Sequence, residues 1–443
     1  MSRERSIMKK IGKTLKSACV LGLSGALLVC SVGCSSSSES SGGEKTGKKQ
    51  LVFWDKSEYV TAYNDMMKEK VDEFAEKYDV DVDYVIVNSG DLEQKLAAAI
   101  ESGNQPDIIM GDNTSVAEYI ASDQLAEVSD VLADIDLKEE AKPYAVFNDT
   151  EYLVPLSLTA PGMFARQDVW EEHGLEAPKT WEELKEQAKI INDPDNGFYA
   201  LGLPLGESGG GDAETFIRTI ILDYGGEVVN AEGEVTVNSP EVLEAFKFIA
   251  SLYEEGLVPP DATTWDDSGN NSAYTAGTVG VVFNSGSLMG TLKDEYPEIW
   301  DNTAIFDYPA AEEGGQSYTL GGANVFGIFK TGDNTETAKE FISYFFSDTD
   351  FYNEMVEAIG GMWQPVINGY DDTEFWQDPD NAVWLTAASN LTLTTAPAPT
   401  TDTAAQGFSN HLCTKALQNI VVNGMDPQEA LDGLEADLNE LYQ

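Results

Sequence analysis

The sequence predicts an α/β fold, and two observations support this prediction. Short apolar runs suited to buried strands alternate with longer runs whose apolar residues recur at helical spacing. Helix-start and helix-stop signals stand at the boundaries of several of the longer runs. Strands that alternate with helices are typical of a parallel sheet covered by helices.

The expected elements follow one another in order along the chain. The apolar runs predict strands at 51–54, 82–87, 107–110, 152–155, 163–166, 199–203, 279–283 and 325–329. The periodic runs predict helices at 60–78, 92–101, from 116, 180–191, from 212, 239–256, 412–422 and 426–441.

Three of these helices carry explicit capping residues. Thr180 and Glu183 form a capping box, in which a hydroxyl and a carboxylate accept hydrogen bonds from amides that the first turn leaves free. Ser239-Pro240 opens a helix that Gly256 closes, because Pro suits the first turn and Gly suits the residue after the last one. Asp426 caps the final helix.

The first 34 residues are typical of an export signal. Six basic residues precede an apolar run, 18–29, that is too short to span a bilayer. Ser31-Val32-Gly33-Cys34 then resembles the cleavage site of a bacterial lipoprotein signal. We expect cleavage of residues 1–33, lipid on Cys34, and an extracytoplasmic protein anchored to the cell membrane. Because Ser31 stands where that signal usually has Leu, ordinary secretory cleavage is the alternative.

Residues 34–49 are expected to form the lipid anchor and a flexible tether. No apolar residue occurs from Ser35 to Lys49, so this segment cannot bury a core. Folding should begin near Gln50. The chain as a whole has 42% hydrophobic and 10% aromatic residues, which is normal for a globular protein.

The charge of the chain excludes nucleic acid as a partner. The chain has 26 basic and 77 acidic residues, and the expected signal holds six of the basic ones and one of the acidic ones. The remainder therefore has 20 basic and 76 acidic residues and a net charge of −56. Phosphate recognition needs clustered Lys and Arg, and this composition argues against it. The same charge favours solubility outside the cell.

Cysteine usage excludes an internal disulfide in the folded part. Cys19 and Cys30 lie in the expected signal and Cys34 is the lipid site, which leaves Cys413 alone. A lone Cys of this kind is more often a small buried residue than a nucleophile.

A series of motifs, spread in order over most of residues 50–441, resembles the extracellular solute-binding proteins of ABC importers. The resemblance is to family 1, the carbohydrate group that is maltose-binding-protein-like. The motifs are Ser102–Ile109, Gly174-Leu175, Pro178–Leu184, Tyr224–Gly226, Asn238–Pro240, Leu252–Gly256, Gly321-Gly322, Ala338–Phe341 and Asp426–Leu431.

The resemblance implies a periplasmic-binding-protein-like fold of type II. In this fold, hinge strands join two α/β lobes, and the ligand cleft lies between the lobes. We expect residues 50–156 with 320–370 to form the first lobe and residues 157–319 with 371–443 to form the second. The lobes would close around the ligand by hinge motion, and the closed form would be recognised by the transporter.

Ligand contacts from the first lobe are expected on loops that follow strands, because the carboxyl ends of strands meet at one edge. Acidic, amide and aromatic side chains are the groups that hold sugars. The candidates are Trp54, Asp55, Asp112, Asn113, Gly322 and Asn324. Thr159, in the first crossover, stands where the family has an acidic contact. Trp54 could instead lie in the core, and Asp112-Asn113 could be a helix cap.

Ligand contacts from the second lobe are expected from Glu207, Asn284 and Ser287. Leu288 occupies a position where the family usually has a stacking Trp. The remaining candidates for the site are Trp265, Trp363, Gln364 and Phe408, and the three aromatic ones could instead be core or surface residues. Packing roles are expected for the other five tryptophans of the folded part, namely Trp170, Trp181, Trp300, Trp376 and Trp384.

Three other classes of protein stay open from the sequence. Gly206-Glu207-Ser208-Gly209-Gly210 is a literal G-x-S-x-G between an expected strand and an expected helix, and His411 follows it, so a secreted serine hydrolase is an alternative. The chain has two His in all and no glycine-rich oxyanion segment, which argues against it. A glycosidase with paired carboxylates and a pure adhesin are the other two.

The sequence predicts no metal site and no cofactor. The segment 193–197 starts like a calcium loop but lacks the Glu at the twelfth position. P-loop, dinucleotide and zinc motifs are absent.

These observations together predict a substrate-binding lipoprotein of an ABC importer, and not an enzyme. Its expected partners are a mono- or oligosaccharide ligand and the membrane permease subunits, with the membrane contacted by the lipid anchor only. We expect a monomer. A non-sugar solute such as a peptide or polyamine is the alternative ligand, since one fold serves many solutes.

Overall fold

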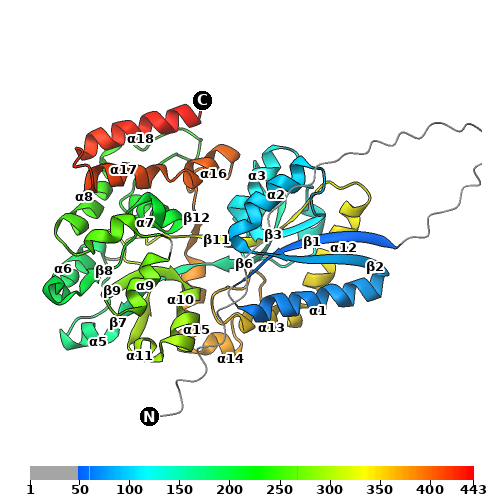
Figure 1. Ribbon diagram of the computed structural model, residues 1–443, viewed down its shortest axis with the longest axis horizontal. Coiled ribbons are helices and arrows are strands. Elements are labelled where there is room, and N and C mark those ends of the chain that lie inside the picture. The colour runs from blue at the N-terminus through cyan, green and yellow to red at the C-terminus, as the bar shows by residue number, and fades with distance from the viewer. Residues whose placement is uncertain (1–47, 59, 267) are drawn as a thin grey trace, which may run out of the picture. The chain divides into compact units, whose positions relative to one another are not determined.

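The computed structural model describes residues 48–58, 60–266 and 268–443, and two larger β-sheets organise them (Figure 1). The expected signal, Cys34 and most of the expected tether lie outside the described residues. The first strand starts at Lys49, one residue before the expected start of folding. Within the described part of the chain, no helix is long and apolar enough to cross a bilayer.

The first sheet has the strand order β12-β11-β3-β1-β2, and β6 also pairs with β11. Its strands are β1 (Lys49–Lys56), β2 (Val80–Val87), β3 (Ile108–Asp112), β6 (Leu153–Thr159), β11 (Thr319–Ile328) and β12 (Leu391–Leu393). Strand β1 is parallel to β2 and β3, as expected, but β11 is antiparallel to β3 and β6. The sheet is therefore mixed rather than parallel, because β11 returns from the second sheet in the opposite direction.

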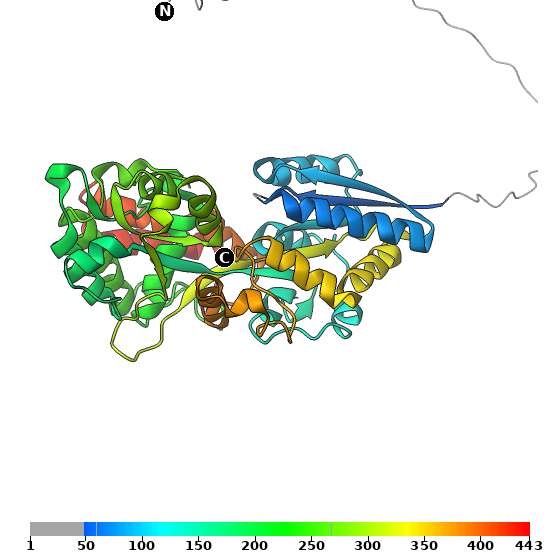
Figure 2. The same cartoon turned by 90° about the horizontal axis from the view of Figure 1, so that it is seen from below.

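Helices cover both faces of the first sheet. Helix α1 (Thr61–Tyr78) and helix α2 (Leu92–Glu101) lie on opposite faces, as Figures 1 and 2 show. The expected apolar face of α1 is buried at Tyr63, Met67, Val71 and Phe74. Asp79 then adopts a left-handed conformation, with φ 55°, and ends the helix.

The second sheet has the strand order β10-β7-β9-β8. Its strands are β7 (Pro161–Arg166), β8 (Tyr199–Leu201), β9 (Val279–Ser285) and β10 (Thr303–Phe306), and a separate hairpin pairs β4 (Val146–Phe147) with β5 (Thr150–Glu151). One hydrophobic cluster joins this sheet to α6 (Trp181–Ile191), α7 (Gly210–Asp223), α8 (Pro240–Glu254), α17 (Leu412–Val421) and α18 (Pro427–Leu441).

The remaining α-helices complete the two layers of helices and the connections between them. They are α3 (Asn113–Ala121), α4 (Ser129–Leu132), α5 (Gln167–Glu172), α9 (Gly269–Thr275), α10 (Gly286–Glu295), α11 (Pro297–Trp300), α12 (Asn334–Ser347), α13 (Thr349–Ala358), α14 (Glu374–Gln377), α15 (Pro379–Ser389) and α16 (Asp402–Ser409).

The capping predictions are confirmed. The Thr180 hydroxyl accepts a hydrogen bond from the Glu183 amide at 3.1 Å, while the Glu183 carboxylate accepts from the Lys179 amide at 2.7 Å. Ser239 caps α8 and Asp426 caps α18 in the same way. The final helix ends at Leu441, as expected.

The chain passes between the two sheets at Ala160, which separates β6 from β7, and it returns along β11. We call the first sheet with α1–α4, α12 and α13 the first lobe, and the second sheet with its helices the second lobe. The expected residue bounds of the lobes stay a prediction. One observation differs from them, since β12 pairs with β11 of the first sheet although residues 371–443 were assigned to the second lobe.

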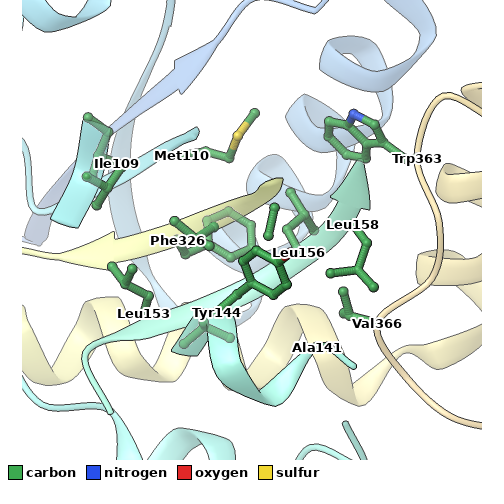
Figure 3. Packing of buried hydrophobic residues seen from close by; sticks show 14 of the residues in the cluster. Ile109, Met110, Ala141, Tyr144, Leu153, Leu156, Leu158, Phe326, Trp363 and Val366 are labelled. Carbon is green, nitrogen blue, oxygen red and sulfur yellow. The ribbon is translucent and has the colours of Figure 1, made fainter. Parts of the chain in front are cut away.

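A hydrophobic core underlies the first sheet and continues past the crossover. In Figure 3, Leu156 of β6 packs beside Phe326 of β11, and Leu158 lies further along the strand, toward Val366 and Trp363. Four of the five tryptophans expected to pack are buried, namely Trp170, Trp181, Trp376 and Trp384, whereas Trp300 is half-buried beneath the Lys293 ammonium. Cys413 is a fully buried free thiol.

Candidate functional site

A cavity of about 240 Å³ lies beside the crossover, where β6 and β11 of the first sheet meet β7 and β9 of the second. Its walls come from segments far apart in the sequence. The lining residues are Thr159, Pro161, Leu203, Pro204, Asp212, Thr215, Phe216, Phe283, Asn284, Ser285, Tyr308, Leu320 and Gly321. Apolar surface alternates with hydroxyl, amide and carboxylate groups, which is the usual composition of a small-molecule site.

One wall of the cavity is aromatic. The rings of Phe216 and Phe283 lie 5.3 Å apart, and those of Phe283 and Tyr308 lie 4.8 Å apart. Trp181 contacts all three rings and is itself fully buried. These tilted and edge-on contacts hold each ring in place, so the wall is rigid before any ligand arrives.

Asp223 connects this wall to the returning strand. Its carboxylate accepts a hydrogen bond from Trp181 Nε1 at 2.7 Å and another from the amide of Tyr318 at 2.8 Å, directly before β11. Burial raises the pKa of Asp223 to about 7, although both hydrogen bonds oppose the shift. The carboxylate of Asp223 therefore holds both Trp181, which contacts the aromatic wall, and the start of β11 in place.

The polar side of the cavity is organised by amides. Asn270 Nδ2 donates to Asp212 Oδ2 at 3.0 Å, and the Asn284 side-chain amide donates to Asn271 Oδ1. Asn284 Oδ1 in turn accepts from the backbone amide of Ser285 at 2.8 Å. These bonds fix the orientation of the Asp212 carboxylate and of the Asn284 amide at the cavity wall.

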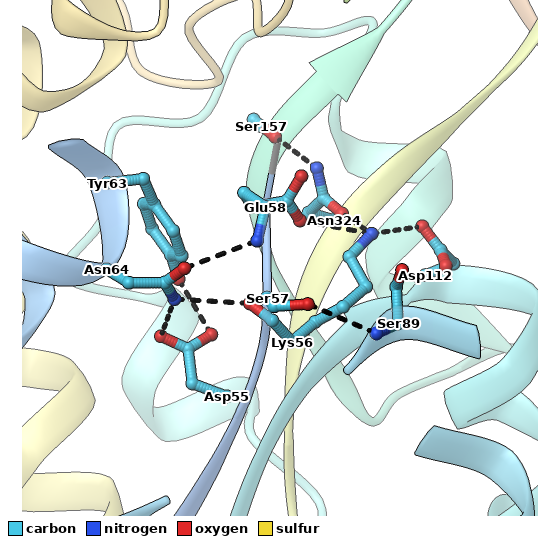
Figure 4. A network of polar contacts seen from close by, with 10 residues as sticks. All are labelled: Asp55, Lys56, Ser57, Glu58, Tyr63, Asn64, Ser89, Asp112, Ser157 and Asn324. Atoms are coloured by element: carbon cyan, nitrogen blue, oxygen red, sulfur yellow. Dashed lines mark hydrogen bonds and ion pairs between the residues drawn. The ribbon is translucent and has the colours of Figure 1, made fainter. Parts of the chain in front are cut away.

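A second polar network lies at the carboxyl ends of β1 and β3 (Figure 4). Lys56 Nζ bonds Asp112 Oδ1 at 2.8 Å and Asn324 Oδ1 at 2.9 Å, and lies 3.2 Å from Glu58 Oε1. Burial alone would lower the pKa of Lys56, but the carboxylates of Asp112 and Glu58 outweigh it and raise the pKa. Asn324 Nδ2 also donates to Ser157 Oγ at 3.0 Å, which ties the network to β6.

Asp55 lies beside this network and is completely buried. Its carboxylate accepts hydrogen bonds from the hydroxyls of Tyr63 and Tyr84 and from Asn64 Nδ2. Burial raises the pKa of Asp55 to about 7, against these three hydrogen bonds. The side chain stabilises the start of α1 on β1 rather than facing the cavity.

The structure brings four of the expected residues together at the crossover. Thr159 and Asn284 line the cavity. Gly322 pairs with Thr159 across β6 and β11, and a Cβ at Gly322 would lie 3.2 Å from Asn113 Oδ1 and 3.5 Å from Thr159 Oγ1. Asn113 is buried and accepts from the amide of Ala323 at 3.0 Å. Asp112 and Asn324 pair with each other across β3 and β11, two residues along β11 from Gly322.

The other expected residues lie elsewhere. Trp363 packs in the core against Tyr63, with ring centroids 4.6 Å apart, so it has no free face for a sugar. Gln364 is buried and accepts from the amide of Ala160 at 2.8 Å. Trp54 is half-buried against the first core, and the exposed Glu207 does not line the cavity.

Three further candidates are placed at the margins of the second lobe. Trp265 lines a separate hollow with Tyr199. Ser287 lies in the first turn of α10, where its hydroxyl is bonded to that of Ser285 at 2.8 Å. Phe408, on α16, lies under the Arg218 guanidinium at 5.5 Å.

Sequence reasoning missed the aromatic wall and Asp212. Phe283 ends an expected strand next to Asn284, so an aromatic at that strand end was the available signal. Phe216 shows only the periodicity of a core helix, and Tyr308 lies in an irregular segment. Nothing local distinguishes either of them from ordinary core residues.

The G-x-S-x-G segment does not have the geometry of a nucleophile elbow. Ser208 lies in a one-turn 3-10 helix, η4 (Glu207–Gly209), seven residues beyond the end of β8, and its φ is not positive. An elbow places the Ser on a strained turn directly after a strand. Within the described residues, no hydrogen bond joins Ser208 to a histidine, and His173 Nδ1 bonds the carbonyl of Val169 at 3.0 Å. Packing explains why residue 206 is a glycine, because a Cβ there would lie 1.9 Å from the carbonyl oxygen of Thr263.

The chain is similar to several binding proteins over long stretches. It is 24% identical over 308 residues to a maltotriose-binding protein of Pyrococcus abyssi, a match that covers 68% of this chain and 63% of that protein. A match with a relative in Brucella abortus, at 24% identity over 277 residues, covers 61% of this chain and 66% of the relative. The chain thus spans about two thirds of the length of these relatives.

The fold is shared with solved structures. The maltose-bound MalE3 structure of T. maritima superposes with a TM-score of 0.73 at 19% identity, and the match covers 88% of this chain and 99% of that one. Structural neighbours of this type are two-lobed, so the fold is the expected one, with two α/β lobes joined by hinge strands.

The family itself is shown by a family-wide sequence pattern. Residues 59–350 match the bacterial extracellular solute-binding proteins, a stretch that holds both crossovers and every residue that lines the cavity. The chain therefore belongs to the family of bacterial extracellular solute-binding proteins.

Proposed function

We propose that this chain binds a sugar, most simply an oligosaccharide, in the cavity at the crossover and delivers it to an ABC permease. One observation carries this proposal: the cavity combines a rigid aromatic wall with a carboxylate, an amide and hydroxyls. Sugars present flat C–H faces and many hydroxyls, and these are the two kinds of group that such walls complement. The sugar-binding relatives support the same ligand class.

The proposed mechanism is capture and release without chemistry. The ligand enters between the lobes, the lobes rotate about the crossover strands, and the closed form docks on the permease. We propose that two bodies move relative to each other. One is formed by residues 50–156 with 320–370, and the other by residues 157–319 with 371–443. Ser208 gives no support to an enzymatic role, because it does not lie on a strained turn directly after a strand.

The proposed location is outside the cytoplasm, on the cell membrane. Membership in an extracellular family supports this location. The anchor is proposed from the sequence alone, with lipid on Cys34 after removal of residues 1–33. Residues 35–47 would then separate the folded unit, which begins at Lys48, from the membrane.

Thermal melting of residues 48–443, which form one compact unit, tests the binding proposal against a panel of mono- and oligosaccharides. A ligand at about 100 times its Kd should add ~2.7 kcal/mol to the free energy of unfolding, a clear rise in Tm. Recovery of intact sugar afterwards would separate binding from hydrolysis. No shift with any sugar would contradict the proposal and turn attention to peptides and polyamines.

A matched pair of variants locates the site. Thr159→Val removes a hydroxyl that lines the cavity and should weaken binding about three- to tenfold, the worth of one hydrogen bond. Thr291→Val, on the exposed side of α10, should leave the affinity unchanged. Equal affinity for both variants would place the ligand elsewhere.

A further inference from the structure

The cavity at the crossover has acidic character and no basic side chain among the described residues that line it. Asp212 supplies a carboxylate at the wall, and Asn270 holds that carboxylate in one orientation at 3.0 Å. Neutral sugars are also bound by carboxylates, so Asp212 alone decides nothing about ligand charge. The informative point is that nothing in the lining offers a counter-charge to a ligand anion.

The aromatic wall also favours a positively charged ligand. The negative faces of aromatic rings attract a cation placed over them. Phe216, Phe283 and Tyr308 all line the cavity, and each is less than one tenth exposed. An ammonium group in the cavity would therefore lie beside aromatic rings as well as the carboxylate of Asp212.

Further carboxyl groups surround the wall. Burial, and then the nearby carboxylates of Asp212 and Asp223, raise the pKa of the Tyr308 hydroxyl well above its usual range. Asp307 precedes Tyr308 and lines the adjoining hollow. The whole chain carries a formal charge of −51. Clefts with one sign of charge concentrate ligands of the opposite sign.

The cations nearest in the sequence to the lining residues are already paired, Arg166 with Asp168 at 2.6 Å and Arg218 with Glu214 at 2.8 Å. Two lysines of neighbouring elements are engaged as well. Lys56, in the first-lobe network, is bound by Asp112, Asn324 and Glu58. Lys179, which lines the adjoining hollow, pairs with Glu313 at 3.1 Å. Neither lysine lines the cavity at the crossover.

We propose that the sugar unit held in this cavity carries a protonated amino group, so that the ligand is an amino sugar with a free amine. The ammonium binds at Asp212 and the aromatic wall, while Thr159, Asn284 and Ser285 take the hydroxyls. This inference rests on the proposed sugar-binding function and narrows it to one substrate class. Uronic acids and sugar phosphates are excluded from the cavity by the same charges.

Titration calorimetry on residues 48–443 with three matched ligand series tests the inference. The series are β-1,4-linked glucosamine oligomers with free amines, their fully N-acetylated counterparts, and cello-oligosaccharides, each at two to four sugar units and pH 6. The free-amine series should bind about tenfold more tightly than either neutral series. The preference should fall at high salt, because screening weakens the attraction, and it should vanish at a pH at which the amine is neutral.

One variant tests whether Asp212 causes the preference for the amine. Asp212→Asn keeps the shape and an acceptor for Asn270 but removes the charge, and it should reduce the preference for the amine from about tenfold to within about threefold. Asp301→Asn, at an exposed carboxylate outside the cavity, should keep the full preference. The salt and pH series on the unaltered protein need no variant and test the inference even if Asp212→Asn does not fold.

Each outcome has a distinct meaning. Neutral oligosaccharides that bind as tightly as their free-amine twins would overturn the inference and leave the sugar-binding function standing. Binding of spermidine with no binding of any sugar would overturn both. A preference for the amine that survives in Asp212→Asn would overturn the assignment to this cavity.

Discussion

The side-chain carbonyl of Gln364 accepts a hydrogen bond from the amide of Ala160 at 2.8 Å, at the residue where the chain leaves the first sheet for the second. The backbone of Gln364 also exchanges two hydrogen bonds with Leu158, at 2.9 and 3.0 Å. A segment more than 200 residues downstream therefore fixes the first crossover. Gln364 is a structural residue of the hinge, and its Nε2 is also satisfied, by the carbonyl of Gly361.

Gln364→Ala should destabilise the fold by ~1–3 kcal/mol, because it leaves the buried amide of Ala160 without an acceptor. Urea denaturation at pH 7 measures the loss. Gln167→Ala, at an exposed position of α5, should change the free energy of unfolding by less than ~0.5 kcal/mol. A Gln364→Ala protein as stable as the Gln167→Ala protein would show that water replaces the lost acceptor.

Asp223 should make stability depend on pH between about 4 and 7. Its folded-state pKa of about 7 lies above the unfolded value of ~3.9, so in this range the folded state binds more protons. The free energy of unfolding therefore falls as pH rises from about 4 to about 7 and then levels off. For this one group the change is at most ~4 kcal/mol. Asp55 adds a change of the same sign, because its folded-state pKa is also raised to about 7.

Asp223→Asn should remove its share of this pH dependence. The difference between the free energies of unfolding at pH 5 and pH 8 would shrink in the variant, while Asp301→Asn, at an exposed site, would keep the original difference. Urea denaturation at the two pH values gives both numbers. An undiminished difference in Asp223→Asn would mean that Asp223 ionises normally in the folded protein.

The buried pair of Glu214 and Arg218 should be costly to break. Arg218 Nε donates to Glu214 Oε1 at 2.8 Å, and Arg218 Nη2 donates to the carbonyl of Gly407 at 3.1 Å. Glu214 Oε2 also accepts from the amide of Thr414 at 2.9 Å, so the pair joins α7, α16 and α17. Glu214→Gln leaves the Arg218 charge buried and should cost ~3–5 kcal/mol in urea denaturation.

Glu244→Gln is the matched control for that experiment. It breaks the exposed pair with Lys247, at 3.0 Å and likewise within one helix, and should cost less than ~1 kcal/mol. Similar losses for the two variants would indicate that water reaches Arg218 in the folded state.

Gly206→Ala should destabilise the second lobe strongly. A Cβ at Gly206 would lie 1.9 Å from the carbonyl oxygen of Thr263, and a backbone oxygen cannot move away without displacing its segment. We expect a loss of at least ~2 kcal/mol by thermal or urea unfolding. Gly290→Ala, inside α10 with nothing within 4 Å of the added Cβ, should instead stabilise the protein slightly. A neutral Gly206→Ala would contradict the packing explanation for this glycine.

The sequence by itself determined the order and type of the elements that it predicted. The helix predicted at 92–101 is α2 residue for residue, and the capping residues Thr180, Ser239 and Asp426 all act as predicted. These features depend on periodicity and on hydrogen bonds within a few residues, which a local pattern contains. The motifs spread along the chain were enough to indicate the family.

Only the tertiary structure decided which side chains form the cavity. Asp212, Phe283 and Tyr308 come from separate segments, and their meeting depends on how α7, β9 and the segment before β11 pack. The same holds for Trp363 and Gln364, which the sequence suggested as ligand contacts and which packing buries at the core and the hinge. Burial and neighbours far away in the sequence set the surroundings of a side chain, and no local pattern encodes them.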